Sequence, residues 1–294
     1  MHKKIVQFLS LLFLAFVWGA SFILMKRGMD VFSYIQVAAI RIFLSFIVLL
    51  PISIKNIKLI TKSNAGILLI SGLIGNFFPA FLFTLSETEL SSSLAGTLNG
   101  LTPFFTLIVG VAAFKNKPSF LQYIGVGVGF IGAALLVTNG NFSSFGNINI
   151  FALFVVLATC MYGINANIIR FKLQGMNGIQ ITSLTFFFIG PIAGAIMLCT
   201  DLSTVFCSTD FMPSLLAIAA LAVFGSVITL FVYYELIHYA GAIFASSATY
   251  IMPFFALMWG VLDGEKINSI HIYSLLVILL GVYLSSVRRK ASFK

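Results

Sequence analysis

The sequence predicts an all-α integral membrane protein whose ten transmembrane helices form two inverted five-helix repeats. Three observations carry this prediction. Hydrophobic residues make up 60% of the 294 residues and charged residues 9%, and the mean hydropathy is +1.09. A soluble domain of this length needs more polar surface to cover its core. Apolar runs long enough to cross about 30 Å of hydrocarbon recur along the chain, and one of them occurs twice.

The repeated run is residues 97–114, and its second copy is residues 247–264. At this offset of 150 positions Pro103 matches Pro253, and the phenylalanine pairs that follow the two prolines also match. The first helices of the two halves align at an offset of 144. Such a duplicated apolar run with an internal proline is typical of membrane proteins built from repeats. The expected repeats are residues 1–140 and residues 148–290.

The expected helices follow one another with short polar breaks between them. In chain order they are residues 5–25, 32–53, 64–84, 90–113, 119–138, 148–169, 178–199, 212–237, 241–262 and 269–287. The first run follows Lys3 and Lys4, as the apolar part of a signal peptide does. It is too long for a signal peptide, lacks a small-x-small cleavage site and precedes nine further spans, so we predict a membrane helix.

The basic residues orient this bundle. Of the 17 Lys and Arg residues, thirteen fall on one side when the loops are assigned alternately, three fall on the other, and Arg41 lies inside a span. The positive-inside rule therefore places both termini in the cytoplasm. Five crossings per repeat is an odd number, so the two repeats must insert with opposite orientation. This inverted arrangement is the one that alternating-access transporters use.

Several segments together resemble a known family. They are FVWGASFILMKR in the first helix, an arginine inside the second (AAIRIFLSF), the prolines of the fourth and ninth helices, the glycine-rich fifth helix, and the closing stretch GVLDGEKINSIHIYSLLVILLGVYL. In this order they resemble the drug/metabolite transporter superfamily, and within it the EamA-type ten-helix permeases. The first half departs from that pattern, because Lys115 and Lys117 stand where the family often has an acidic turn. The resemblance implies a permease that exports small metabolites, often amino acids.

A glycine pattern in the fifth expected helix needs its own interpretation. Gly127, Gly129 and Gly132 have the spacing of a dinucleotide-binding fingerprint. They lie inside an apolar span, without a preceding strand or an acidic residue about 20 positions later. Close helix packing through small residues is the better explanation. We expect no cofactor and no metal.

Arg41 is the most informative single residue. It lies about ten residues into its expected helix, too deep to reach the interface easily, and placing an arginine there costs about 2.5–3.5 kcal/mol on insertion scales. It should therefore face the interior of the bundle. Glu235 lies too far along the membrane normal for a direct ion pair. Two interpretations of Arg41 stay open: contact with a substrate carboxylate, or a structural role in which it binds carbonyls at helix breaks.

Uncharged polar and aromatic residues gather at mid-depth in helices of both halves. Such groups must turn inward in hydrocarbon, and we expect many of them to line a cavity. With Arg41, the expected substrate-binding residues are Trp18, Asn76, Thr97, Asn99, Tyr162, Asn165, Tyr233, Ser247 and Tyr250. Pro103 and Pro253 are the expected hinges, because proline lacks an N–H and permits a bend.

The predicted function is alternating-access export or exchange of small metabolites, most simply amino acids or similar zwitterionic or amphipathic compounds. No acidic residue or histidine is expected at the bilayer centre, which favours facilitated efflux or exchange over proton antiport. The partners are a small-molecule substrate and the lipid bilayer of the cell (inner) membrane. Nucleic acid is not expected, because the basic residues form no continuous face. The oligomeric state is open.

Two alternatives remain. A nucleotide-sugar carrier of the same superfamily would need several basic residues around the cavity, and the sequence offers one. A membrane enzyme would need clustered titratable or nucleophilic groups within the bundle. The three histidines (His2, His238 and His271) fall near the ends of spans, so we expect a transporter and not an enzyme.

Overall fold

The computed structural model describes residues 2–137, 150–203, 205–262 and 269–286, and every regular element within them is a helix. The first half comprises α1 (His2–Met29), α2 (Tyr34–Asn56), η1 (Ile57–Leu59), α3 (Ala65–Gly72), η2 (Leu73–Phe77), α4 (Phe78–Ser86), α5 (Ser92–Leu98), η3 (Asn99–Leu101), α6 (Thr102–Ala112) and α7 (Phe120–Val137). The second half comprises α8 (Ile150–Lys172), α9 (Gly178–Leu198), η5 (Val205–Cys207), α10 (Phe211–Ala222), η6 (Val223–Ile228), α11 (Thr229–Ala240), α12 (Ala242–Ser246), α13 (Ala248–Leu262) and α14 (Ser269–Ser286).

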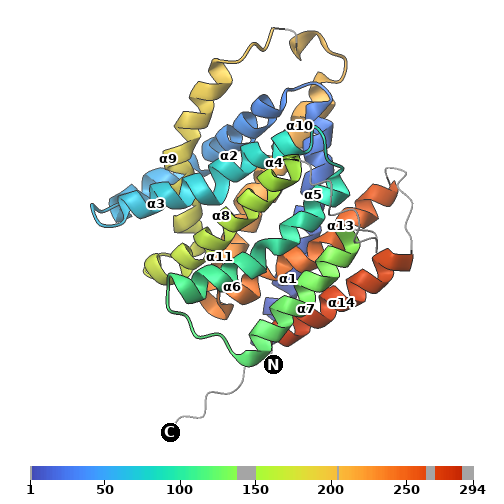
Figure 1. The fold of residues 1–294 in the computed structure, drawn as a ribbon. Helices are drawn as coiled ribbons and strands as arrows, with labels where there is room; N and C mark the ends of the chain where they lie inside the picture. The colour runs from blue at the N-terminus through green and yellow to red at the C-terminus, as the bar shows by residue number, and fades with distance from the viewer. Residues whose placement is uncertain (1, 138–149, 204, 263–268, 287–294) are drawn as a thin grey trace.

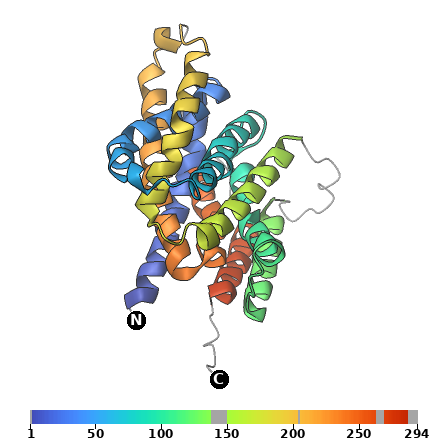
Figure 2. The ribbon, with the colours of Figure 1, turned by 90° about the vertical axis from the view of Figure 1, so that its left-hand side faces the viewer.

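The length and composition of these helices confirm the predicted membrane fold class. Within the described residues, eight helical segments are long and apolar enough to cross a membrane, and residues 120–132 of α7 form a shorter apolar helix. Together with α7 and α14, these eight segments form the ten helical rods of the described residues, in the order that the sequence predicts. Figures 1 and 2 show that α1 begins and α14 ends at the same end of the bundle, whereas α9 and α10 are joined at the opposite end.

The duplication is visible in how the second helix of each half begins. Ser33 and Gln36 form a capping box before α2, in which each side chain bonds the other residue's backbone N–H. Asn177 and Gln180 form the same box before α9, 144 residues later. A capping box satisfies backbone donors that a helix start otherwise leaves unpaired. Equivalent helices thus begin with the same local chemistry in both halves.

The third helical rod of each half is interrupted at equivalent positions. η2 and η6 are π-helical turns that separate α3 from α4 and α10 from α11. At the offset of 150, Gly75 and Asn76 in η2 correspond to Gly225 and Ser226 in η6. π-Turns inside α-helices occur frequently at functional sites, and both of these turns border the central cavity.

The halves pack through reciprocal contacts. α2 packs along α9 and α7 along α14, while α1 packs on α13 and α8 on α6. The α7–α14 contact is close, because a Cβ on Gly281 would lie 2.7 Å from Gly129 Cα. Gly129 also lies against the Tyr250 ring. The glycine-rich face of α7 therefore serves helix packing, as the sequence predicts for Gly129.

The predicted hinge prolines lie in helical rods that are both interrupted. In the first half the 3₁₀ turn η3 comes directly before α6, whose second residue is Pro103. In the second half Pro253 lies inside α13, and the break is at Ser247 between α12 and α13. The two rods are thus interrupted at slightly different places relative to the shared proline.

Candidate functional site

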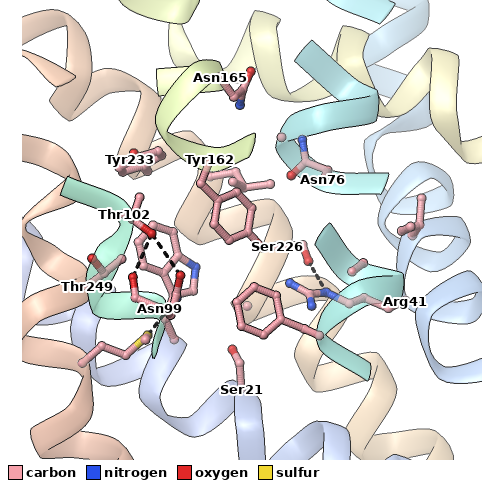
Figure 3. Close-up of a pocket in the computed structure, with 18 of the residues that line it drawn as sticks. Ser21, Arg41, Asn76, Asn99, Thr102, Tyr162, Asn165, Ser226, Tyr233 and Thr249 are labelled. Atoms are coloured by element: carbon pink, nitrogen blue, oxygen red, sulfur yellow. Dashed lines mark hydrogen bonds between the residues drawn. The ribbon is translucent and has the colours of Figure 1, made fainter. Parts of the chain in front are cut away.

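A central cavity lies between the two halves (Figure 3). Broken helical segments supply much of its wall, because η2, η3 and η6 each contribute polar residues. Residues of α1, α2, α4, α6, α8, α9, α11 and α13 complete it. The described lining residues are Trp18, Ser21, Phe22, Met25, Arg41, Ile42, Gly75, Asn76, Ala80, Phe83, Asn99, Thr102, Tyr162, Asn165, Phe186, Gly225, Ser226, Leu230, Tyr233, Tyr234, Thr249 and Met252.

Arg41 is the residue with a formal charge among these described lining residues. Its Nε donates a hydrogen bond to Ser226 Oγ at 2.9 Å, and its NH1 lies 4.0 Å from Met25 Sδ. Ser226 in turn donates to the Leu221 carbonyl oxygen at 3.5 Å. Figure 3 shows the guanidinium beside Ser226 at the cavity wall. Arg41 is therefore anchored through one nitrogen to the π-turn of the other half, and in the described part of the chain NH2 has no hydrogen-bond acceptor.

A hydroxyl–amide network lines another part of the cavity. Asn76 and Asn165 each donate an Nδ2 hydrogen to the Tyr234 hydroxyl, at 3.3 and 3.5 Å. Ser71 donates to Asn165 Oδ1 at 2.6 Å and so fixes the orientation of that amide. The network joins helices of both halves around Tyr234. It presents neutral hydrogen-bonding groups that a small polar ligand can use.

Aromatic rings provide the apolar walls. Trp18 donates from Nε1 to Thr229 Oγ1 at 3.1 Å, and its ring meets Tyr233 edge-on at 5.2 Å. Phe83 is stacked on Tyr162 and contacts Phe22, with ring centroids 5.9 Å apart in both pairs. The cavity therefore combines one cation, neutral polar groups and several aromatic faces.

The structure brings together most, but not all, of the residues that the sequence predicts for the site. The predicted residues that line the cavity are Trp18, Arg41, Asn76, Asn99, Tyr162, Asn165 and Tyr233. Ser247 and Tyr250 lie elsewhere: Ser247 donates to the Phe244 carbonyl at 2.6 Å, and Tyr250 donates to the Val126 carbonyl on α7 at 3.1 Å. The side chain of Thr97 is outside the described part of the structure.

Sequence analysis missed several lining residues. Tyr234 accepts the hydrogen bonds of the amide network. It follows Tyr233 directly, and two consecutive helix residues point in different directions, so the sequence offers no reason to expect both in the cavity. Thr102 donates to Asn99 Oδ1 at 3.1 Å, one turn along the broken fourth rod. Thr249 and Met252 line the wall from α13. Their signal is the i, i+3 spacing of Asn99 and Thr102, and of Thr249 and Met252, which places each pair on one face of a helix.

Glu235 and His238 lie in the C-terminal half of α11. Glu235 Oε1 accepts a hydrogen bond from the Gly178 N–H, at the start of α9, at 2.6 Å. A carboxylate at a helix N-terminus is favourable because the N–H groups there lack helical partners. Arg170 NH1 donates to the His238 carbonyl oxygen at 2.6 Å. These groups therefore tie helix ends together, and Glu235 has a partner other than Arg41.

The family model and three relatives that match this chain are all described as transporters. The model of the EamA-like transporter family matches residues 6–138 and 149–287. The uncharacterized inner membrane transporter YedA of Escherichia coli K12 is 26% identical, with 94% of this chain and 89% of YedA covered. The S-adenosylmethionine/S-adenosylhomocysteine transporter of Chlamydia muridarum is 25% identical, with 91% and 87% covered. The uncharacterized transporter YyaM of Bacillus subtilis is 25% identical, with 97% and 94% covered.

A solved crystal structure shares the fold. It matches with a TM-score of 0.68 and 14% sequence identity, over 96% of this chain and 95% of that chain. At this identity the likeness concerns the arrangement of the helices alone.

Proposed function

Because this chain belongs to the EamA-like transporter family, we propose that it exports or exchanges small zwitterionic or amphipathic metabolites across the cell membrane by alternating access. Amino acids and compounds with an amino-acid end are the preferred substrates. The observation that carries the proposal is a half-buried arginine, Arg41, at the wall of a central cavity that is otherwise lined by neutral polar and apolar groups in the described part of the chain.

The geometry of Arg41 supports binding of a carboxylate. A guanidinium binds a carboxylate through two parallel N–H···O bonds, which is stronger than a bond between neutral groups. Ser226 binds Nε, and NH1 makes a long contact of 4.0 Å with the Met25 sulfur, so the edge formed by NH1 and NH2 is the one that a ligand carboxylate can bind. A half-buried arginine is costly without an anion, and a substrate carboxylate would provide the counter-charge during transport.

The rest of the cavity fits the remaining parts of such a substrate. The amide oxygens of Asn76 and Asn99 and the tyrosine hydroxyls can accept hydrogen bonds from an ammonium group. Aromatic faces such as those of Trp18 and Tyr162 suit an apolar or flat side group. S-adenosylmethionine and S-adenosylhomocysteine, named for the chlamydial relative, each join an amino-acid end to a purine. They therefore belong in the substrate panel for this chain.

The repeat architecture supports alternating access. Reciprocal contacts of α1 with α13 and of α8 with α6 offer two similar arrangements that can exchange when one half rocks against the other. The breaks at η2, η3 and η6 border the cavity, where interrupted helices let rods bend. The excess of basic residues in the loops on one side supports a cytoplasmic location for both termini.

The test is counterflow in proteoliposomes that contain the purified protein. Vesicles are loaded with an unlabelled compound, and uptake of the same labelled compound is followed, with protein-free vesicles as the control. The panel contains amino acids, S-adenosylmethionine and a nucleotide sugar. We expect exchange of at least one compound with an amino-acid end. Exchange of the nucleotide sugar alone would instead favour a nucleotide-sugar carrier and overturn the proposal.

A further inference from the structure

Glu87 has an unusual position at the end of α4. Its backbone N–H bonds the Phe83 carbonyl at 3.0 Å, so the residue continues the last turn of the helix. Both oxygens of its carboxyl group are buried, and neither has a hydrogen-bond partner among the residues that the structure describes. Glu89, two residues later, is exposed. The sequence assigns both residues to an outer loop, but the helix turns Glu87 into the protein.

Glu87 lies at the end of α4, on the same helix face as residues that line the cavity. Ala80 and Phe83, which are seven and four residues earlier on the same face, both line it. Ser86 donates to the Phe151 carbonyl at the start of α8 at 2.9 Å, which fixes the end of α4. Glu87 itself does not line the cavity. It therefore lies about one helical turn beyond the Phe22, Phe83 and Tyr162 rings.

Two cations from two other helices act on the Glu87 carboxyl group. They are Arg41 of α2 and Lys26 of α1, and the uncharged Tyr162 of α8 stacks on Phe83, one helical turn before Glu87. Lys26 is exposed. Burial raises the pKa of Glu87, which follows the last residue of its membrane span, well above its ordinary value, and the two cations only partly oppose this effect.

We propose that Glu87 is a proton-binding site that controls opening of the outer end of the cavity. A carboxylate buried without hydrogen bonds costs several kcal/mol, and burial of the neutral acid costs less because it carries no charge. The neutral acid is therefore the stable form while the carboxyl group is buried as in this structure, and we assign this arrangement to the closed state. When the α4 end separates from its neighbours and water reaches the side chain, the carboxylate becomes hydrated and the proton leaves. This inference rests on the proposed alternating access.

The sign of the pH effect follows from this difference. The pKa of Glu87 is higher in the closed state than in the open state, so binding of a proton favours closure. Lower pH on the outer side therefore closes the cavity, and higher pH opens it. The ratio of open to closed molecules changes by up to about tenfold per pH unit between the two pKa values. The group is at one end of the cavity, so it needs no proton relay through the membrane.

The first measurement detects the proton itself. Infrared spectroscopy of the reconstituted protein near neutral pH distinguishes the carbonyl stretch of a buried carboxylic acid from a carboxylate. Glu87→Gln removes the group and keeps its size, and Glu89→Gln is the matched control on the same turn. We expect the acid band in the unaltered protein and in Glu89→Gln, and its loss in Glu87→Gln. An unchanged spectrum in Glu87→Gln would mean that Glu87 is ionised, which overturns the proposal.

The second measurement detects opening of the outer end of the cavity. Ser21 lines the cavity, and Ser21→Cys is introduced after the native cysteines are replaced by serine. Right-side-out vesicles are labelled with an impermeant maleimide at several external pH values. The labelling rate of Ser21→Cys with Glu87 intact is divided by the rate of the same cysteine variant that also carries Glu87→Gln. Because the thiolate fraction rises with pH in both proteins, this ratio removes that effect. We expect this ratio to rise with pH; a constant ratio overturns the proposal. Neither measurement uses a substrate, so a failure of the counterflow assay is separate from a failure of this inference.

Discussion

Arg41 Nε and Ser226 Oγ lie 2.9 Å apart and join the two halves of the protein across the cavity wall. Ser226 belongs to the π-turn η6, and its equivalent at the offset of 150 is Asn76 in η2, which also lines the cavity. The deep arginine is thus held by the helix break of the opposite repeat. One of the two interpretations of Arg41 expected contacts with a helix break, and the contact found uses a hydroxyl instead of a carbonyl.

Ser226→Ala should loosen Arg41 without unfolding the protein. A hydrogen bond to a charged group contributes about 1.5–3 kcal/mol, so the thermal midpoint in detergent should fall. Ser246→Ala is the matched control, because Ser246 is also buried but donates to a carbonyl of its own helix. In an Arg41→Ala background the effect of Ser226→Ala should largely vanish. Equal effects in both backgrounds would show that the bond contributes nothing.

Two equivalent glycines allow the repeats to approach each other. A Cβ on Gly19 would lie 2.7 Å from Phe255 Cβ, and one on Gly163 would lie 2.8 Å from Phe105 Cβ. Gly19→Ala and Gly163→Ala should each destabilise the protein by about 1–3 kcal/mol, since backbone must move. Gly127→Ala is the control, because a Cβ there meets nothing within 4 Å. Thermal unfolding followed by size-exclusion chromatography measures all three; equal midpoints would refute the close packing.

Replacement of the paired prolines tests whether their interrupted rods must bend during transport. Pro103→Ala and Pro253→Ala restore a backbone N–H, which can bond the preceding turn and stiffen the rod. We expect slower initial rates of counterflow in each variant, with normal amounts of folded protein in the membrane. The double variant should be slowest. Unchanged rates in all three variants would mean that the prolines only shape the resting structure.

The proposed sidedness can be tested with single cysteines. Lys117 lies before α7 and Thr209 lies before α10, and both are exposed. After removal of the native cysteines, Lys117→Cys should react with an impermeant maleimide from the cytoplasmic side and Thr209→Cys from the outer side. Intact cells and inside-out vesicles distinguish the two. Labelling of both cysteines from one side would refute the orientation.

The sequence predicts the fold better than it predicts the site. Duplicated prolines and apolar runs can be recognised in the sequence, and the capping boxes and the π-turns η2 and η6 repeat at the same offsets. The position of a residue within an apolar run also indicates its depth in the membrane, and this depth predicts that Arg41 and Asn165 line the cavity. The direction in which a side chain points around its helix is set by packing between distant segments. Tyr250 therefore was expected in the cavity but bonds α7 instead.

Glu87 illustrates the same limit at a helix end. The apolar run stops before it, so the sequence places it in a loop. The backbone bond to Phe83 extends the helical turn by one residue and buries the carboxyl group. A difference of two positions thus separates the buried carboxyl group of Glu87 from the exposed Glu89. Sequence patterns locate helix ends less finely than this.

The central claim is that Arg41 binds a substrate carboxylate, and equilibrium binding to purified Arg41 variants tests it most directly. The ligands are the most active amino acid of the counterflow panel and its decarboxylated amine. Arg41→Ala should raise the dissociation constant of the amino acid by about ten- to one-hundredfold, the loss expected for a charged hydrogen bond, and leave that of the amine unchanged. Arg41→Lys should give an intermediate value, because it keeps the charge but loses the planar two-bond contact. Equal weakening of both ligands, or of neither, would contradict the claim and make Arg41 structural.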